Sequence, residues 1–416
     1  MTALWMVASS MLSAAAATPT FHKDIEPLFQ KHCQSCHRPG EAAPMSLIRY
    51  QDAKPWAKAI REAVLQRRMP PWHADPNVGR LANARTLDES EIHTIRDWVD
   101  AGAPKGSPKD APKPRRFVDG WTIAKPDLVL ELPVEYEVPA SGPIDYVHFA
   151  VPTHFTEDRW VQQVEVRPGL RSLVHHIGVD IRPKGSKWLP QVQPGAGTLL
   201  KERVSTRETG NEHIAMYLPG SAGEVLPEGS ARLISAGSQL IFQVHYQPNG
   251  KPGRDRSRVG LVFAKTPVEK RIHTVSVGNA DFVIPPGNPD LRVVGSFLLF
   301  RPVTILSVVP HMHLRGKSFR CWVDFPDKTR VHLVRVPNYN RLWQAKYQLA
   351  DPLQAPAKSW IQCLAAFDNS ANNPWNPDPK AEVRWGDQTT DEMMVGYIDV
   401  AFPAEWPLTD FYKLSK

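Results

Sequence analysis

Cysteine is scarce in this sequence, and the positions of the cysteines exclude a four-cysteine zinc site. The 416 residues include four cysteines. One C-x-x-C pair is present, at Cys33 and Cys36, and no second pair follows to complete a four-cysteine zinc site. Cys321 and Cys363 fall on expected strands much later in the chain. An oxidising compartment would allow these two to form a disulfide, and the alternative is two buried thiols.

Long hydrophobic runs and blocks of one charge are also missing. After the N-terminal stretch, no apolar segment reaches the roughly 20 residues that a bilayer span needs. The formal net charge is +7, but the basic residues are spread along the chain and no nucleic-acid motif is present. We interpret this excess as a solvated surface, suited to docking an acidic redox partner rather than a nucleic acid.

Residues 1–18 have the composition of a secretory signal peptide. The stretch 4–17 is apolar and ends in four alanines, although no Lys or Arg precedes it. An uncleaved anchor is the alternative, but the stretch is short for a span. We therefore expect a periplasmic or secreted protein with no integral membrane span after signal cleavage.

A haem attachment motif follows the first expected helix. Residues 22–31 have helical apolar spacing and lead into Cys33-Gln-Ser-Cys36-His37. A C-x-x-C-H sequence is typical of c-type haem attachment, in which two thiols add to the vinyl groups and the histidine binds iron. A bare C-x-x-C pair would also suit a redox disulfide. The adjacent histidine, behind an export signal, favours one covalently attached haem c.

The sixth haem ligand has three candidates. A methionine on a later loop is common in small cytochromes c. Met69 heads the rigid sequence Met-Pro-Pro-Trp after a helical stretch, and we favour it. Met45, eight residues past His37, is the alternative, and His73 is a third choice.

The segment that follows predicts one more helix and then a linker. The stretch 86–89, Thr-Leu-Asp-Glu, has the pattern of a capping box, and an apolar stripe continues from it to a stop at Gly102. We expect a small all-α, cytochrome c-like haem domain over residues 19–104. Residues 105–118 are rich in Pro and Lys and predict a semi-rigid linker.

From about residue 119 the pattern changes to short strands separated by Pro and Gly. Examples are 127–133, 159–166 and 239–246. This pattern is typical of β-sandwiches, and the remaining length suits two of them. We place the seam near Ile284-Pro-Pro-Gly287, which gives all-β domains at 119–283 and 284–416.

Two histidines share one face of an expected strand near residue 310. Alternate strand residues point to opposite faces, so His311 and His313 lie on the face opposite Val308 and Met312. Two imidazoles at this spacing can bind one metal ion, although the pair does not identify the metal. The alternative is two surface histidines.

Other ligand candidates lie on separate strands. His245 falls on the face opposite the apolar residues of 239–246. His175 and His176 are adjacent, so both can reach one metal only at a strand end or in a distorted strand. Met393 lies on the face opposite Met394, and a thioether favours copper over zinc. In isolation, ordinary packing would explain each of these residues.

Taken together, the chain resembles the copper type II, ascorbate-dependent monooxygenases, the family of peptidylglycine α-hydroxylating monooxygenase and dopamine β-monooxygenase. The resemblance covers residues 120–412 and rests on four motifs in order. These are the His175-His176 pair, Gln243-Val-His245-Tyr246, His311-Met-His313 and Asp391-Glu-Met393.

The resemblance implies two jelly-roll domains that each hold one copper ion. It assigns His175, His176 and His245 to the electron-supplying copper. It assigns His311, His313 and Met393 to the copper at which O2 is activated for C–H hydroxylation. The reductant would be ascorbate or a redox protein.

Two departures from the family bear on the substrate. Peptide-amidating members hold the substrate carboxylate with an arginine two residues before the HxH pair and an asparagine two after the methionine. Here these positions are Val309 and Val395, whereas the tyrosine four residues after the methionine is retained as Tyr397. We therefore expect a neutral or apolar small substrate, with Tyr397 in the catalytic site.

The fused haem domain is a further departure from the family members named above, which take electrons from ascorbate. We expect electrons to enter through this domain. The leading hypothesis is an exported, haem-linked copper monooxygenase. The alternative from another class is a periplasmic electron-transfer or copper-handling protein without hydroxylase activity. A reductase of small nitrogen oxides is disfavoured, because Cys321 and Cys363 lack the flanking histidines of a blue-copper site.

Overall fold

The computed structural model describes residues 17–41, 43–142, 144–200, 212–386 and 388–410. Most of the expected signal peptide therefore lies outside the described residues. The chain divides into two compact units. The first comprises Met1–Ser35, Met45–Pro70 and Thr86–Arg115, and the second comprises Cys36–Pro44, Pro71–Arg85 and Arg116–Lys416.

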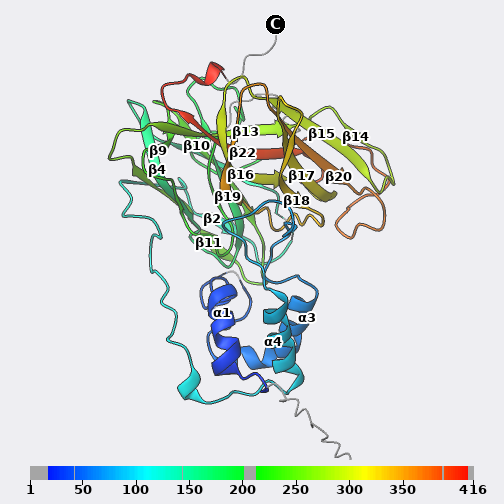
Figure 1. Cartoon of the computed structure of the whole chain (residues 1–416). Helices are drawn as coiled ribbons and strands as arrows, with labels where there is room; N and C mark the ends of the chain where they lie inside the picture. The colour runs from blue at the N-terminus through cyan, green and yellow to red at the C-terminus, as the bar shows by residue number, and fades with distance from the viewer. Residues whose placement is uncertain (1–16, 42, 143, 201–211, 387, 411–416) are drawn as a thin grey trace, which may run out of the picture. The chain divides into compact units, whose positions relative to one another are not determined.

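The first unit is helical (Figure 1). Its elements are η1 (Phe21–Ile25), α1 (Glu26–His32), α2 (Tyr50–Ala53), η2 (Lys54–Trp56), α3 (Ala57–Leu65), α4 (Glu89–Asp100) and η3 (Pro108–Asp110). Three fully buried aromatic side chains form its centre, with Phe29 edge-on to Trp98 and Phe21 tilted against it. The Trp98 indole N–H donates to the Pro104 carbonyl at 3.1 Å, which satisfies its one buried polar group.

The helix expected after residue 86 begins two residues later than its sequence pattern indicates. A reciprocal capping box is present, but it joins Asp88 and Glu91 rather than Thr86 and Glu89. The Glu91 N–H donates to Asp88 Oδ1 at 2.8 Å, and the Asp88 N–H donates to Glu91 Oε2 at 3.0 Å. Both registers place an acid three residues after a capping residue, so the sequence alone could not choose between them.

The second unit is β-rich, which confirms the predicted change from helices to strands. Its first sandwich packs two layers around one core. One layer is the sheet β6 (Thr198–Leu199), β3 (Val147–Pro152), β10 (Gln239–Tyr246), β5 (Val174–Arg182) and β7 (Glu212–Tyr217). The facing layer is β1 (Leu128–Glu131), β12 (Arg258–Phe263), β4 (Arg159–Arg167) with β8 (Glu224–Val225), and β9 (Ser230–Ile234). A small ribbon pairs β2 (Tyr136–Val138) with β11 (Gly253–Asp255).

The second sandwich encloses a separate core. One layer is β15 (Leu291–Leu298), β20 (Trp360–Phe367), β17 (Gly316–Asp324) and β18 (Arg330–Val336). The other is β13 (Lys270–Gly278), β22 (Val395–Pro403), β16 (Val303–His311) and β19 (Tyr347–Ala355), and β14 (Val283–Ile284) pairs separately with β21 (Val383–Arg384). Figure 1 shows β13, β22 and β16 stacked side by side.

One sheet passes through both sandwiches. Ser230 and Ala231 of β9 pair in parallel with Lys270 and Arg271 of β13, so the outer layers form a single nine-stranded sheet. The two cores divide between β12 and β13, because β13 already packs in the second core. This division falls earlier in the chain than the expected seam at 283/284.

A segment that lies between two helices in the sequence belongs to the β-rich unit. Residues Pro71–Arg85 run along β19, where Leu81 bridges Leu349 and the Ala82 N–H donates to the Gln348 carbonyl at 2.8 Å. Ala74 is buried in the second core, and the Trp72 ring lies edge-on to Tyr347 at 4.9 Å. We call Pro71–Arg85 the strap.

The expected disulfide is present. Cys321 of β17 and Cys363 of β20 are directly opposite each other in the antiparallel pair, with their Cα atoms 4.2 Å apart and a sequence separation of 42. Both residues are fully buried, and no Cβ fits at Gly396 of β22 because it would stand 2.6 Å from the Cys363 sulfur.

Removing this disulfide is expected to destabilise the second sandwich. Cross-linking positions 42 residues apart restricts the unfolded chain, which predicts a loss of about 2–5 kcal/mol in the free energy of unfolding for the Cys321→Ala, Cys363→Ala variant. Denaturant unfolding of the two proteins measures the difference. The reduced wild type is the matched control, and a loss below about 1 kcal/mol would contradict the prediction.

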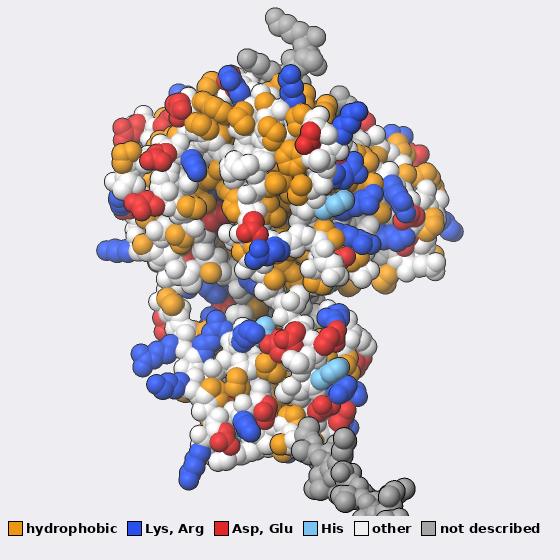
Figure 2. Space-filling model, in the orientation of Figure 1, with side chains coloured by type: hydrophobic (Ala, Val, Ile, Leu, Met, Phe, Trp, Pro, Cys, Tyr) orange, Lys and Arg blue, Asp and Glu red, His pale blue; other side chains and the backbone are white. Residues whose placement is uncertain are grey.

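Charges of both signs are mixed on the surface (Figure 2). On the face drawn in Figure 2, Lys and Arg side chains lie among Asp and Glu side chains. Among the residues that the structure describes, no helix is long and apolar enough to span a membrane.

Candidate metal centres

Three histidines of the first sandwich gather around one point. His245 of β10 lies opposite His176 of β5, and the next pair joins Tyr246 to Val174, so His175 is an extra residue in β5. A β-bulge of this kind lets two consecutive side chains point to the same side. It explains how both members of the His175-His176 pair reach one site, which a regular strand forbids.

The geometry of this cluster suits a metal ion. Ligand nitrogens of the three rings lie within 4.8 Å of one another, and the Nδ1 atoms of His175 and His176 are 3.0 Å apart. The ring centroids are between 5.0 and 5.3 Å apart. Metal ligation requires neutral imidazoles. Burial lowers the pKa of His175 to about 4 and that of His245 to about 3, and it holds the pKa of His176 well below its usual range.

Copper binding to this cluster is expected to release almost no protons at pH 6. Three exposed imidazoles with pKa near 6.5 would release about two protons on binding at that pH. The lowered pKa values of His175 and His245 mean that the folded rings are already neutral. Calorimetry of copper binding in buffers of different ionisation enthalpy measures the proton count.

The same shifts set the sign of the pH dependence of stability without metal. The unfolded chain binds protons on these rings as the pH falls through about 6.5, and the folded chain does so only near pH 4. The free energy of unfolding of the copper-free protein should therefore decrease as the pH is lowered from about 6.5 to about 4. His175→Phe should weaken the slope, and an unchanged slope would contradict the assignment.

A second pair, His311 and His313, stands at the end of β16, with its ring centroids 5.2 Å apart. The His311 Nδ1–H donates to Gln344 Oε1 at 2.5 Å, and the His313 Nδ1–H donates to the Asp391 carbonyl at 3.2 Å. Both partner atoms are hydrogen-bond acceptors, so the proton of each neutral ring is on Nδ1. Each ring therefore presents its unprotonated Nε2 for a metal. Burial also lowers the pKa of His313 to about 3, with the neighbouring His311 adding to the shift.

The segment before β22 brings Met393 to this pair. His311 is paired with Val395, and the buried Glu392 carboxylate accepts the backbone N–H groups of His313 at 2.9 Å and Arg315 at 2.5 Å. Met393, between Glu392 and β22, is half-buried. These links fix the Met393 segment beside the histidine pair, and the two imidazoles with a thioether form a donor set that suits copper.

The other positions singled out by the sequence also lie here. The ring of Tyr397, half-buried in β22, is 6.0 Å from that of His311. Val309 pairs with Tyr397, and both Val309 and Val395 are buried. Neither valine offers a polar group to a substrate.

Gln344 is expected to tune metal affinity at the His311 site. Partners of a ligating histidine typically change metal affinity 10- to 100-fold when they are removed. Gln344→Leu should therefore weaken copper binding at this site by about that factor, because the Nδ1–H loses its acceptor. Competitive titration with a copper chelator measures the affinity. Gln348→Leu, an exposed change on β19, is the control, and equal affinities in the two variants would contradict the role.

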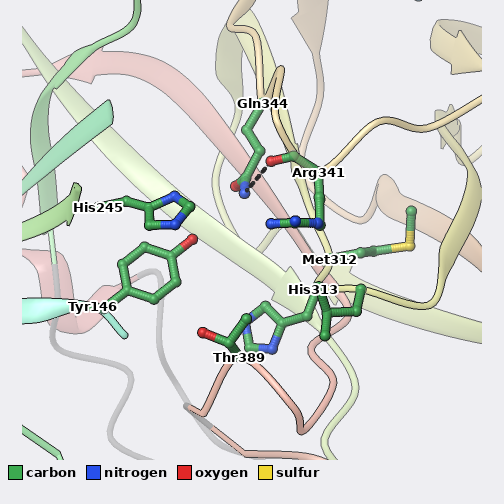
Figure 3. A pocket seen from close by; sticks show the side chains of 8 residues that line it. Tyr146, His245, Met312, His313, Arg341, Gln344 and Thr389 are labelled. Atoms are coloured by element: carbon green, nitrogen blue, oxygen red, sulfur yellow. Dashed lines mark hydrogen bonds between the residues drawn. The ribbon is translucent and has the colours of Figure 1, made fainter. Parts of the chain in front are cut away.

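One cavity is lined by residues of both clusters. Figure 3 shows Tyr146 and His245 on one side and His313, Arg341 and Gln344 on the other. The Tyr146 hydroxyl lies 3.1 Å from His176 Nε2, and Gln344 accepts a hydrogen bond from His311. Each histidine cluster thus has one hydrogen-bond partner in the cavity lining. Burial raises the pKa of Tyr146 to about 12, so its hydroxyl stays protonated.

The haem motif follows α1; Cys33 belongs to the first unit, and Cys36 and His37 belong to the second. Cys33 caps the helix, and Cys36 and His37 lie in the turns after it. Cys33 and Met45 are half-buried against the helical core, which fits a haem held on that core. Met69 is 37% exposed, and the choice between it and Met45 stays a prediction. The disulfide uses the other two cysteines, Cys321 and Cys363.

Several residues near the clusters were missed by sequence reasoning. Tyr146, Arg341 and Gln344 lie in connections that carry no motif. Asp180 and His213 form a partly buried pair at 3.1 Å, and the His213 ring is stacked on Tyr397. The placement of Asp180 on the face that carries His176 was readable from strand parity, but its partner on β7 was not.

Comparisons with known proteins add no family assignment. No known family model matches this chain, and no curated protein matches it in sequence. Among solved structures, the chain is weakly similar to the infectious bursal disease virus Gx strain, with 9% identity, 67% of this chain and 71% of that chain covered, and a TM-score of 0.21. The VP2 subviral particle of the same virus matches with 9% identity, 68% and 73% coverage, and a TM-score of 0.19. These scores carry no argument about fold or function.

Proposed function

We propose that this protein is an exported copper monooxygenase that hydroxylates a C–H bond of a small substrate, with a c-type haem as its electron entry. The observation that supports the proposal is one cavity lined by His245 of the three-histidine cluster and by His313 of the second pair. Met393 follows Glu392, whose carboxylate accepts the His313 N–H, and its thioether would complete the second ligand set. The jelly-roll architecture and the cytochrome c identity of the helical unit belong to the same proposal.

The overall reaction must balance two electrons. Substrate C–H, O2, two electrons and two protons give C–OH and water. Copper, when bound, supplies one-electron redox chemistry and a site for O2. His175, His176 and His245 would hold one ion, and His311, His313 and Met393 would hold the other.

The protein's own residues prepare these sites. Gln344 and the Asp391 carbonyl fix the tautomers of His311 and His313, so both Nε2 atoms face a metal without a proton to lose. Tyr146 holds the His176 ring through its hydroxyl, which lies 3.1 Å from Nε2. The buried Glu392 holds the backbone at His313. Tyr397 lies against the His311 ring, where a substrate C–H bond would approach.

The decisive experiment measures substrate-dependent O2 uptake together with a hydroxylated product. Protein matured in a haem-exporting periplasm, loaded with copper and supplied with ascorbate, is screened against small molecules under ¹⁸O2. Incorporation of one ¹⁸O atom into a product is the expected result. Haem and copper that cycle between redox states without product from any substrate would overturn the proposal.

One observation favours the alternative, an electron-transfer or copper-handling protein. Tyr146, the partner of His176, and Gln344, the partner of His311, line the same cavity, which suits electron movement without a substrate between the clusters. The two readings separate on the ¹⁸O experiment. They also differ for Tyr397→Phe, which should leave copper reduction unchanged in both readings and lower product formation only in a monooxygenase.

A further inference from the structure

The cavity shared by the two histidine clusters contains a cation without a counter-charge. Arg341 lies in the loop 337–346, between β18 and β19, and its guanidinium group is directed into the cavity among His245, His313 and Tyr146 (Figure 3). Among the described residues, none forms an ion pair with Arg341 or accepts a hydrogen bond from its guanidinium. Its Nε is buried with no partner.

No acidic side chain in the described part of the cavity lining compensates this charge. The groups that raise the pKa of Arg341 against the effect of burial are the hydroxyls of Tyr146 and Tyr339, not carboxylates. Asp145, which lines an adjoining hollow, is exposed and makes no ion pair with Arg341. The Trp375 ring centroid lies 5.0 Å from the guanidinium carbon of Arg341.

The groups around Arg341 raise the free-energy cost of burying its positive charge. The positive charge of Arg341 helps to lower the pKa of all three rings of the first cluster. The two proposed ligand sets are neutral, so any metal they bind adds positive charge to the same cavity. A half-buried cation that faces other cations is unfavourable unless an anion joins it.

The loop that carries Arg341 is fixed at both clusters. Trp343 places its ring 6.3 Å from that of His175, and Gln344 accepts from His311. The guanidinium is therefore held between the two sites by its own neighbours, rather than extended freely into solvent. A planar, fixed guanidinium matches a carboxylate with two parallel hydrogen bonds.

We propose that Arg341 is an anion-binding residue and that the substrate of this site carries a carboxylate. This revises the expectation of a neutral substrate, which considered only Val309 and Val395. The carboxylate binds the Arg341 guanidinium, and an adjacent apolar carbon faces the His313 side of the cavity near Met312 and Leu314. The reaction at that carbon rests on the proposed function, whereas anion binding does not.

The test uses a matched set of small probes with the full-length, haem-containing protein. Butyrate, butyramide and butylamine are titrated by calorimetry into copper-free and copper-loaded protein. Copper-free wild type is expected to bind butyrate about 10- to 100-fold more tightly than butyramide, the factor that charge-assisted hydrogen bonds provide. Butylamine should bind least.

Variants assign the preference to Arg341. Arg341→Gln is expected to lose the preference for butyrate over butyramide, and Arg341→Lys should retain part of it. Arg320→Gln, which removes an exposed arginine on β17, is the control and should behave as wild type. Circular dichroism and copper content confirm that each variant is folded.

Two outcomes would overturn the proposal. One is equal affinity of copper-free wild type for butyrate and butyramide. The other is an unchanged preference in Arg341→Gln, which would place the anion elsewhere. Failure of the proposed function is a separate result, because an Arg341-dependent anion preference would remain even if no carboxylate gave a hydroxylated product.

Discussion

Replacement of His313 by alanine is expected to lower the copper content from two ions per chain to one and to abolish hydroxylation. His313 is buried, its Nδ1–H is committed to the Asp391 carbonyl, and its Nε2 is the ligand atom that remains. Loss of one imidazole leaves His311 and Met393, which are too few to hold an ion for O2 chemistry. Turnover should fall on the order of 1,000-fold or more, because the metal that supplies the chemistry is absent.

The measurement is metal analysis of purified protein together with product formation. The three-histidine cluster should keep its copper in His313→Ala, because none of its ligands is changed. His332→Ala, an exposed histidine on β18, is the control and should retain two coppers and full activity. Two copper ions in His313→Ala would contradict the two-site assignment. Wild-type protein that contains one haem, and zinc or no metal in place of copper, would indicate that the chain shares the fold of these monooxygenases but not their reaction.

Replacement of Cys33 and Cys36 by alanine is expected to remove the haem and to stop turnover that depends on a protein electron donor. Under the proposed function the two thiols would attach the haem vinyl groups, so the variant should contain no covalent haem. Copper content should stay at two, since none of the proposed copper ligands is changed. Ascorbate should still support turnover if it reduces copper directly.

Comparing ascorbate with a protein electron donor distinguishes direct reduction of copper from reduction through the haem. Absorbance of the denatured protein reports covalent haem, and stopped-flow reduction reports electron arrival at copper. Met69→Ala and Met45→Ala, compared by haem spectrum and reduction potential, identify the sixth ligand within the same set. Full turnover with both reductants in the haem-free variant would end the relay hypothesis and leave the helical unit with a structural role.

Strand periodicity predicted much of the candidate site. Alternation placed His311 with His313 and His245 away from the apolar core of its strand, and the structure keeps both assignments. It failed at His175, because a bulge is created by pairing with β10 and has no signature in β5 itself. Register is a property of two strands, so one strand's sequence cannot contain it.

The side chains that line the cavity shared by the clusters were beyond sequence reasoning for a similar reason. Tyr146, Arg341 and Gln344 lie in connections with no periodicity, and they meet only because β3, β16 and β19 are brought together by the sheets. The capping box shows the same limit on a smaller scale. Two overlapping patterns satisfied the rule, and packing of α4 selected the later one.

The strap has a consequence for the order of folding during synthesis. Trp72 and Ala74 find their partners on strands that begin some 200 or more residues later, among them Tyr347 on β19. The strap therefore stays undocked until nearly the whole chain has been synthesised. Under the proposed function, haem attachment at Cys33 and Cys36 would precede this step, while the connection between α3 and α4 is not yet docked. Maturation would then begin with haem attachment, continue with sheet formation and end with docking of the strap. A defect in β19 would therefore leave a protein that carries haem but whose strap is not docked.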